Sequence, residues 1–209
     1  SFDKLRMSYW LNPHPELVEG WKQRMMQGKT VVVTGGTSGI GEVAALNLAG
    51  QGARIVLIAR DSARGEATLA KLRQANPAAQ HTAHYGDLSV IADMKRVAQA
   101  VASSEARIDV LINNAGAVFL ARKVSADGLE MTFATNHMAY FVVTNILLDR
   151  LKATPGARIV STASDAHKSG KLDFDDLQSE KSYSSFRVYG TSKLCNILFT
   201  RELARQSPR

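Results

Sequence analysis

The sequence predicts an α/β fold in which a parallel sheet carries helices on both faces, and three observations lead to this prediction. Short runs of β-branched and other apolar residues recur along the chain, as expected for strands buried on both sides. Longer segments with helical periodicity separate these runs. Turn-forming and polar residues follow most of the runs, so strands and helices alternate, which is the pattern of a parallel sheet.

The composition is that of one ordinary globular domain. The chain has 209 residues, of which 45% are apolar and 22% charged. The net charge of +7 suits an anionic ligand, but the basic residues are scattered and no nucleic-acid-binding signature is present, so we expect no nucleic-acid partner. The single cysteine, Cys195, lies in the apolar stretch "LCNILF", which indicates a buried thiol and favours a reducing, cytoplasmic location.

Residues 1–28 look like a separate N-terminal leader. The stretch "WLNPHPELVEGW" carries both tryptophans and predicts a short helix packed on the domain, with an amphipathic membrane-contacting helix as the alternative. No apolar run is long enough to span a bilayer. The first residue is Ser1 rather than methionine, so membrane attachment through a segment outside this sequence stays open.

The regular pattern begins at Lys29, and each element has a local signal. "KTVVVTG" is a β-branched run, Asp61 is a suitable helix N-cap, and Asp127-Gly128 is expected near the start of a long helix. The predicted strands are 29–35, 53–60, 81–88, 108–116 and 157–164. The predicted helices are 40–50, 61–75, 90–104, 126–152 and 184–205, with a polar loop at 165–183.

In folds of this kind ligands bind outside the carboxyl ends of the strands. The glycine-rich segment that follows the first strand is therefore the first candidate site. "TGGTSGIG" spaces its glycines as G-x-x-x-G-x-G between a strand and a helix. Glycines let the backbone approach a phosphate closely, and the helix N-terminus offers free N–H groups. This placement predicts a dinucleotide site that includes Gly35, Thr37, Ser38, Gly39, Ile40 and Gly41.

The residue after the second strand bears on the choice of cofactor. NAD sites of this type commonly have an acidic residue there, whereas this chain has Ala59-Arg60. A guanidinium suits the 2′-phosphate of NADP(H), so the sequence favours NADP(H) over NAD(H). The alternatives are that Arg60 simply faces solvent, or that Asp61 beside it opposes the phosphate.

Polar residues also follow the third and fourth strands. Asp87-Leu88 follows the third, where the aspartate is suited either to accept from an adenine amino group or to cap the next helix. "NNAG" follows the fourth and is suited either to line a cofactor or to brace neighbouring strands. We count Asp87, Leu88, Asn114, Ala115 and Gly116 as candidate cofactor-binding residues.

"YGTSK" puts Tyr189 and Lys193 four residues apart, which places both on one face of a helix. A tyrosine and a lysine at this spacing, taken alone, would be interpreted as a chance pair on the surface of a helix. A lysine ammonium beside a phenol stabilises the phenolate form, which makes the phenol a usable proton donor and acceptor near neutral pH.

"TGGTSGIG", "NNAG" and "YGTSK", in this order, resemble the short-chain dehydrogenase/reductase family over about residues 29–209. "TNHMAYF", "DLQSE" and "SKLCNILFTRELA" further resemble its retinol dehydrogenase-like branch. The resemblance implies a Rossmann-like doubly wound parallel sheet and hydride transfer between NADP(H) and a carbonyl or alcohol, with a lipophilic, retinal-like substrate. A non-catalytic NADP(H) sensor or scaffold and a pigment-type ring double-bond reductase are the alternatives.

The resemblance also implies roles for individual residues. Tyr189 becomes the general acid and base, and Lys193 additionally bonds the nicotinamide ribose. Ser164, rather than Ser161, holds the substrate oxygen, and Asn136 helps to hold a water in the proton relay. His137 and His167 are interpreted as structural, because the histidines lack metal-ligand spacing and no metal is expected.

Members of the family continue with two further strands and a substrate-binding segment, whereas this sequence ends at Arg209. The resemblance therefore implies that the domain at 29–209 is incomplete at its C-terminus and that one sheet edge lies open. Substrate identity and oligomeric state are not readable from the sequence.

Overall fold

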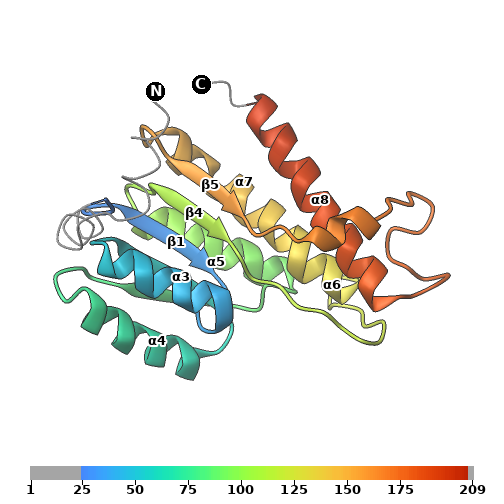
Figure 1. Cartoon of the computed structure of the whole chain (residues 1–209), viewed down its shortest axis with the longest axis horizontal. Coiled ribbons are helices and arrows are strands. Elements are labelled where there is room, and N and C mark those ends of the chain that lie inside the picture. Colours follow the sequence, from blue (N-terminus) through green and yellow to red (C-terminus); the bar gives the residue numbers. More distant parts are fainter. Residues whose placement is uncertain (1–24, 207–209) are drawn as a thin grey trace, which may run out of the picture.

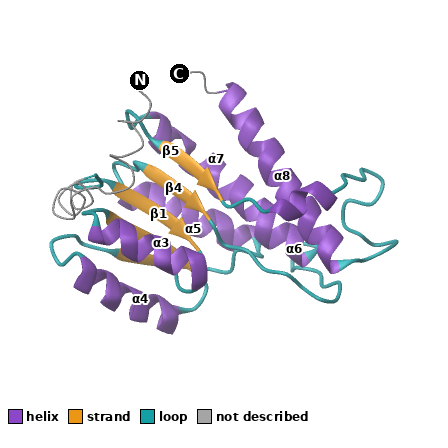
Figure 2. Ribbon diagram, viewed as in Figure 1, coloured by secondary structure: helices purple, strands orange, loops and turns teal. Residues whose placement is uncertain are grey.

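Five parallel strands form the centre of the molecule in the order β3-β2-β1-β4-β5 (Figure 1 and Figure 2). The computed structural model describes residues 25–206. The predicted parallel α/β fold is confirmed, and the strand order reverses between β1 and β4, where such sheets bind ligands. The strands are β1 (Thr30–Thr34), β2 (Arg54–Ala59), β3 (Thr82–Tyr85), β4 (Val110–Asn113) and β5 (Arg158–Ser161).

Helices cover both faces of the sheet (Figure 1), and an apolar core lies between the sheet and the helices on each face. Val31 and Val33 of β1 pack with α3 (Gly39–Gly50) and α4 (Ser62–Ala75), whereas Val32 points to the other face. There α5 (Ile91–Ser104) and α7 (Ala139–Lys152) cover the sheet. The last described helix, α8 (Ser185–Gln206), contacts β5 and the segments before α7. Alternate residues of each central strand are therefore buried on opposite faces, as a doubly wound sheet requires.

The helix predicted at 126–152 begins later than expected. Gly128 adopts a φ of +79° in a turn that the Ser125–Leu129 backbone hydrogen bond closes. The buried carboxylate of Glu130 then accepts from the next backbone N–H groups and caps the helix. The helical segment starts with α6 (Met131–Phe133), widens to a π-helical turn, η1 (Ala134–Met138), and continues as α7.

The segment predicted as a polar loop, 165–183, also differs in part. It opens with a short 3-10 helix, η2 (Asp165–Ser169), because the Ser164 hydroxyl accepts from the backbone N–H of Ala166 and caps it. The predicted leader lies almost wholly outside the described residues, of which 25–28 form a turn. None of the helices in the described part combines the length and the apolar character needed to cross a membrane.

Asp109 fastens the start of β1 to the segment before β4, and its charge should matter for stability. Its carboxylate accepts from Thr30 N at 3.0 Å, from Lys29 Nζ at 3.0 Å and from the Arg107 guanidinium at 2.6 Å. Burial alone would raise the pKa of Asp109, but these bonds outweigh it and lower the pKa to about 2. This stabilisation is complete above the unfolded-state pKa near ~3.9 and disappears as the pH falls toward the folded-state value.

We therefore expect Asp109→Asn to lower the free energy of unfolding at pH 7 by about 1–2 kcal/mol, allowing for solvent screening of the exposed partners. The difference from the unmodified protein should shrink when urea unfolding is measured between pH 4 and pH 2.5. Asp149→Asn, at an exposed position on α7, is the control and should change stability by less than ~0.5 kcal/mol. Equal stability of the Asp109 variant at pH 7 would contradict the role of the charge.

Candidate active site

The carboxyl ends of the strands open into a hollow of about 670 Å³. The loops after β1, β2, β3 and β4 form its walls, together with one face of α8. Most of the predicted site residues line it: Gly35, Thr37, Ser38, Ile40, Gly41, Arg60, Asp87, Leu88, Asn114, Ala115, Gly116, Tyr189 and Lys193.

The glycine-rich turn is held against the turn that follows β4. Asn114 donates its side-chain amide to the carbonyls of Thr34 and Gly35, at 3.2 and 3.1 Å. Gly35 has a φ of +67°, and a Cβ there would come within 2.7 Å of the Ala115 Cα. The "NNAG" segment therefore braces the neighbouring turn and lines the hollow, and its contact with a cofactor stays a prediction.

The turn has the properties of a phosphate-binding site. Ser38 is the N-cap of α3, and its hydroxyl makes no capping bond to the helix. The first N–H groups of a helix lack intrahelical partners and lie at the positive end of its dipole. Gly39 does not line the hollow, but its φ of +54° gives the turn before α3 a left-handed backbone conformation. The backbone and its donors thus fit the pyrophosphate of a dinucleotide.

Two arginines stand at the end of the hollow beside β2. Arg60 and Arg64 are both exposed and both line it. The Asp61 carboxylate between them accepts from Arg64 N at 2.8 Å and caps α4, as the sequence predicts. The negative charge of Asp61 therefore interacts with the N-terminus of α4. Arg64 was missed by the sequence analysis, although its position in the first turn of the helix after β2 is the signal that would have found it.

Asp87 shapes a local turn. Its Oδ1 accepts from the backbone N–H and the hydroxyl of Ser89, at 2.9 and 2.8 Å. Helix α5 has Val90 as its N-cap, so the alternative in which Asp87 caps this helix is wrong. The aspartate lies three residues before the cap and holds the preceding turn. A bond from Asp87 to an adenine amino group stays a prediction.

Tyr189 and Lys193 lie side by side on α8, as their spacing predicts. Lys193 is only 3% exposed, and its Nζ lies 5.6 Å from the centroid of the Tyr189 ring. The ammonium donates to the backbone carbonyl of Thr162, just after β5, at 2.9 Å. Burial lowers the pKa of Lys193. A half-buried phenol therefore faces the hollow beside a buried amine, an arrangement suited to proton transfer.

Asn136 lies behind the wall of the hollow. It is fully buried in the π-helical turn, and its side chain accepts from Ala117 N at 2.7 Å while donating to the Ala117 carbonyl and the Ser192 hydroxyl. Its own carbonyl accepts from the Asn196 amide at 2.8 Å. Asn136 therefore ties the loop after β4 to α8, and its predicted part in a proton relay stays a prediction.

Ser164 follows β5 but does not line the hollow, and its hydroxyl caps η2. Ser161 lies within β5 and has a buried hydroxyl with no hydrogen-bond partner in the described part of the chain. The structure thus separates the two serines as expected and leaves the substrate-binding role of Ser164 a prediction. His137 and His167 make structural bonds, to the Asn196 side chain and the Ser164 carbonyl.

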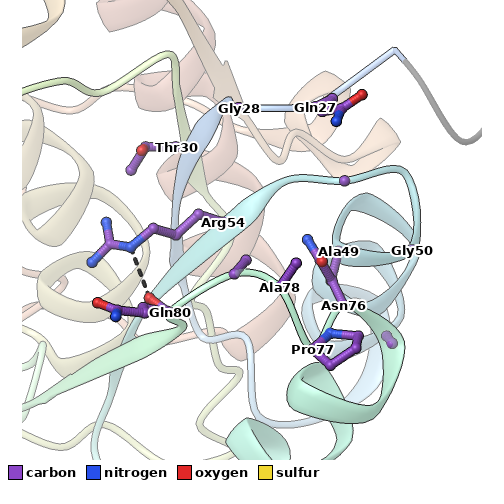
Figure 3. A pocket seen from close by; sticks show the side chains of 13 residues that line it. Gln27, Gly28, Thr30, Ala49, Gly50, Arg54, Asn76, Pro77, Ala78 and Gln80 are labelled. Carbon is purple, nitrogen blue, oxygen red and sulfur yellow. Dashed lines mark hydrogen bonds between the residues drawn. The ribbon is translucent and has the colours of Figure 1, made fainter.

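A larger hollow, of about 830 Å³, lies at the opposite edge of the sheet and contains no predicted site residue (Figure 3). Among the described residues that line it, Arg54 alone is charged. Its guanidinium donates to the Gln80 carbonyl at 2.7 Å (Figure 3). The same guanidinium pairs with the Glu105 carboxylate. The described residues of this hollow therefore include no ionisable group outside an ion pair.

The fold and the site define a dinucleotide-binding α/β protein with a tyrosine–lysine pair at the strand ends. The sequence profile of the family described as short chain dehydrogenase matches residues 29–209, and the chain belongs to this family. Membership also supports the broader expectation of an NAD(P) site and confirms the predicted resemblance.

Its relatives include mouse retinol dehydrogenase 14, 41% identical over 192 residues, and human retinol dehydrogenase 12, 41% identical over 181 residues. Each alignment covers 87% of this chain, which spans only 58% and 57% of the two relatives. An uncharacterised Mycobacterium paratuberculosis protein of known structure is 34% identical, with a TM-score of 0.75 over 88% of this chain and 64% of that one. A short-chain dehydrogenase from Escherichia coli CFT073, solved with NADPH, shares the fold at 22% identity, with a TM-score of 0.71 over 88% of this chain and 74% of that one.

Proposed function

We propose that this chain carries the NADP(H)-binding and proton-transfer parts of an oxidoreductase that interconverts a carbonyl and an alcohol. The observation that carries the proposal is the Tyr189–Lys193 pair beside a phosphate-binding turn in one hollow. Family membership supports the reaction class.

The residues of this chain would handle the substrate oxygen and its proton. When bound, the nicotinamide cofactor supplies the hydride. Tyr189 donates its phenolic proton to the developing alkoxide, and the Lys193 ammonium stabilises the phenolate that remains. Ser164 would orient the same oxygen, and Asn136 would help to hold a water molecule in the proton relay. In the reverse direction the Tyr189 phenolate accepts the proton of the alcohol.

A lipophilic aldehyde or ketone is the substrate class that we propose. Val118, Phe119 and Met131 line the same hollow as Tyr189, and Val118 is 45% exposed. Apolar side chains that face an open site gain most by covering an apolar ligand. The names of the relatives, retinol dehydrogenases, support the same class.

We propose that Arg60 and Arg64 together select NADP(H) over NAD(H). Two exposed guanidinium groups at one end of the hollow match a doubly charged phosphate, and Asp61 is held by the α4 terminus. Replacing both arginines with alanine should weaken NADPH binding about 10–100-fold, the range for charge-assisted hydrogen bonds, and leave NADH binding within about threefold. Calorimetric titration with each cofactor measures both values, and Arg60→Asp should shift the preference further toward NADH.

Arg73→Ala is the matched control, because Arg73 is exposed on the same helix but does not line the hollow. An equal loss of affinity for both cofactors would show that the arginines do not read the 2′-phosphate. Failure of the unmodified chain to bind either cofactor would overturn the proposed site in this chain.

A further inference from the structure

The ammonium of Lys193 is buried without a carboxylate beside it. Within residues 25–206 no ion pair to Lys193 is present, and its one hydrogen bond goes to the Thr162 carbonyl. The groups that face it are the Tyr189 ring on its own helix, the Tyr140 ring from α7 and that carbonyl. The nearest titratable group of η1, His137, is bonded to Asn196 instead. Something other than an anion must therefore compensate the loss of hydration.

Tyr140 supplies a second aromatic ring to this ammonium. The Lys193 Nζ lies 5.6 Å from the Tyr140 ring centroid, the same distance as from Tyr189. A cation within about 6 Å of an aromatic face is attracted by the ring quadrupole, most strongly where water is excluded. Tyr140 is 1% exposed within the core under the sheet, so its ring is fixed in this place.

The Tyr140 hydroxyl does not contribute to the contact with the ammonium. It is buried and makes no hydrogen bond within the described part of the chain. Burial raises the pKa of Tyr140, so the phenol stays neutral and supplies no counter-charge. The ring face is therefore the part of Tyr140 that can stabilise the ammonium, in addition to the Thr162 carbonyl and the Tyr189 ring.

We propose that Tyr140 is a positioning residue whose ring holds the Lys193 ammonium, in its charged form, beside Tyr189. The effect on proton transfer rests on the proposed function, whereas the contact itself does not. Removal of the ring should make the charged lysine less stable and lower the pKa of Lys193 further.

The test is an NMR titration of the full chain labelled with ¹³C at the lysine ε-carbon, without cofactor or substrate. Tyr140→Leu should lower the pKa of Lys193 by about one unit, from the typical strength of such a contact. Tyr140→Phe keeps the ring and should change it by less than about 0.3 units. The exposed Lys123, which lies over a different ring, is the internal reference for the chemical shifts.

If Tyr140→Leu does not fold, 3,4,5-trifluorophenylalanine at position 140 keeps the shape while weakening the ring quadrupole, and it should lower the pKa of Lys193 relative to Tyr140→Phe. An unchanged Lys193 titration in either ring-weakened variant would overturn the proposal. So would a shift in Tyr140→Phe as large as in Tyr140→Leu, because the hydroxyl would then be responsible. Since no turnover is measured, failure of the proposed enzymatic function would leave this result intact.

Discussion

Replacing Tyr189 with phenylalanine should reduce the turnover of a lipophilic aldehyde by about a thousandfold, within the range for loss of a general acid. The substitution removes one oxygen atom from a residue that lines the hollow and leaves the ring beside Lys193 in place. The glycine-rich turn and the two arginines are untouched, so the Kd for NADPH should stay within about threefold. Loss of turnover without loss of binding is the signature of a group that acts in the transition state.

The measurement is NADPH oxidation with a panel of lipophilic aldehydes and ketones, with cofactor affinity from calorimetry. Tyr85→Phe is the matched control, since it removes the same atom from a tyrosine whose hydroxyl bonds Glu66 outside the hollow. Its turnover should stay within about threefold of the unmodified chain. Turnover of the Tyr189 variant equal to that of the control would remove Tyr189 from its proposed role.

The fold and the glycine-rich turn were readable because their signals are local. A β-branched run followed by glycines and a helix determines where β1 ends and where α3 begins. The start of the helix before α7 was misjudged because Asp127-Gly128 has the composition of a helix start. The actual cap is the carboxylate of Glu130, a residue type that is less common at this position.

Contacts between distant segments were not readable. The ring of Tyr140, at the start of α7, meets Lys193 of α8, and no local pattern predicts a contact between residues so far apart in sequence. The hydrogen bonds of Asn136 to Ala117 and Ser192 likewise join three segments, and a helical asparagine alone does not predict them. Arg64 is an intermediate case. The helix that carries it was predicted, but not that the first turn of this helix places Arg64 at the hollow.

Substitution of Gly41 should affect cofactor binding as strongly as the loss of Tyr189 affects turnover. A Cβ at this position would collide with the carbonyl oxygen of Gly35 and with the side-chain amide of Asn114. Both atoms belong to the braced pair of turns, and they are linked to each other by a hydrogen bond, so neither moves without disturbing the other. Gly41→Ala should therefore displace α3 from the turn, weaken NADPH binding at least about 100-fold and lower the free energy of unfolding by about 1–3 kcal/mol.

Gly50→Ala separates this collision from the general effect of replacing a helical glycine. Gly50 ends the same helix, and a Cβ there meets no atom within 4 Å. The control should keep its NADPH affinity and gain up to about 1 kcal/mol of stability, because alanine restricts the unfolded chain. Undiminished binding by a folded Gly41→Ala protein would mean that the phosphate does not approach the backbone at this turn. The cofactor would then have to be held mainly by the arginines at the other end of the hollow, and NADPH affinity should become strongly salt-dependent.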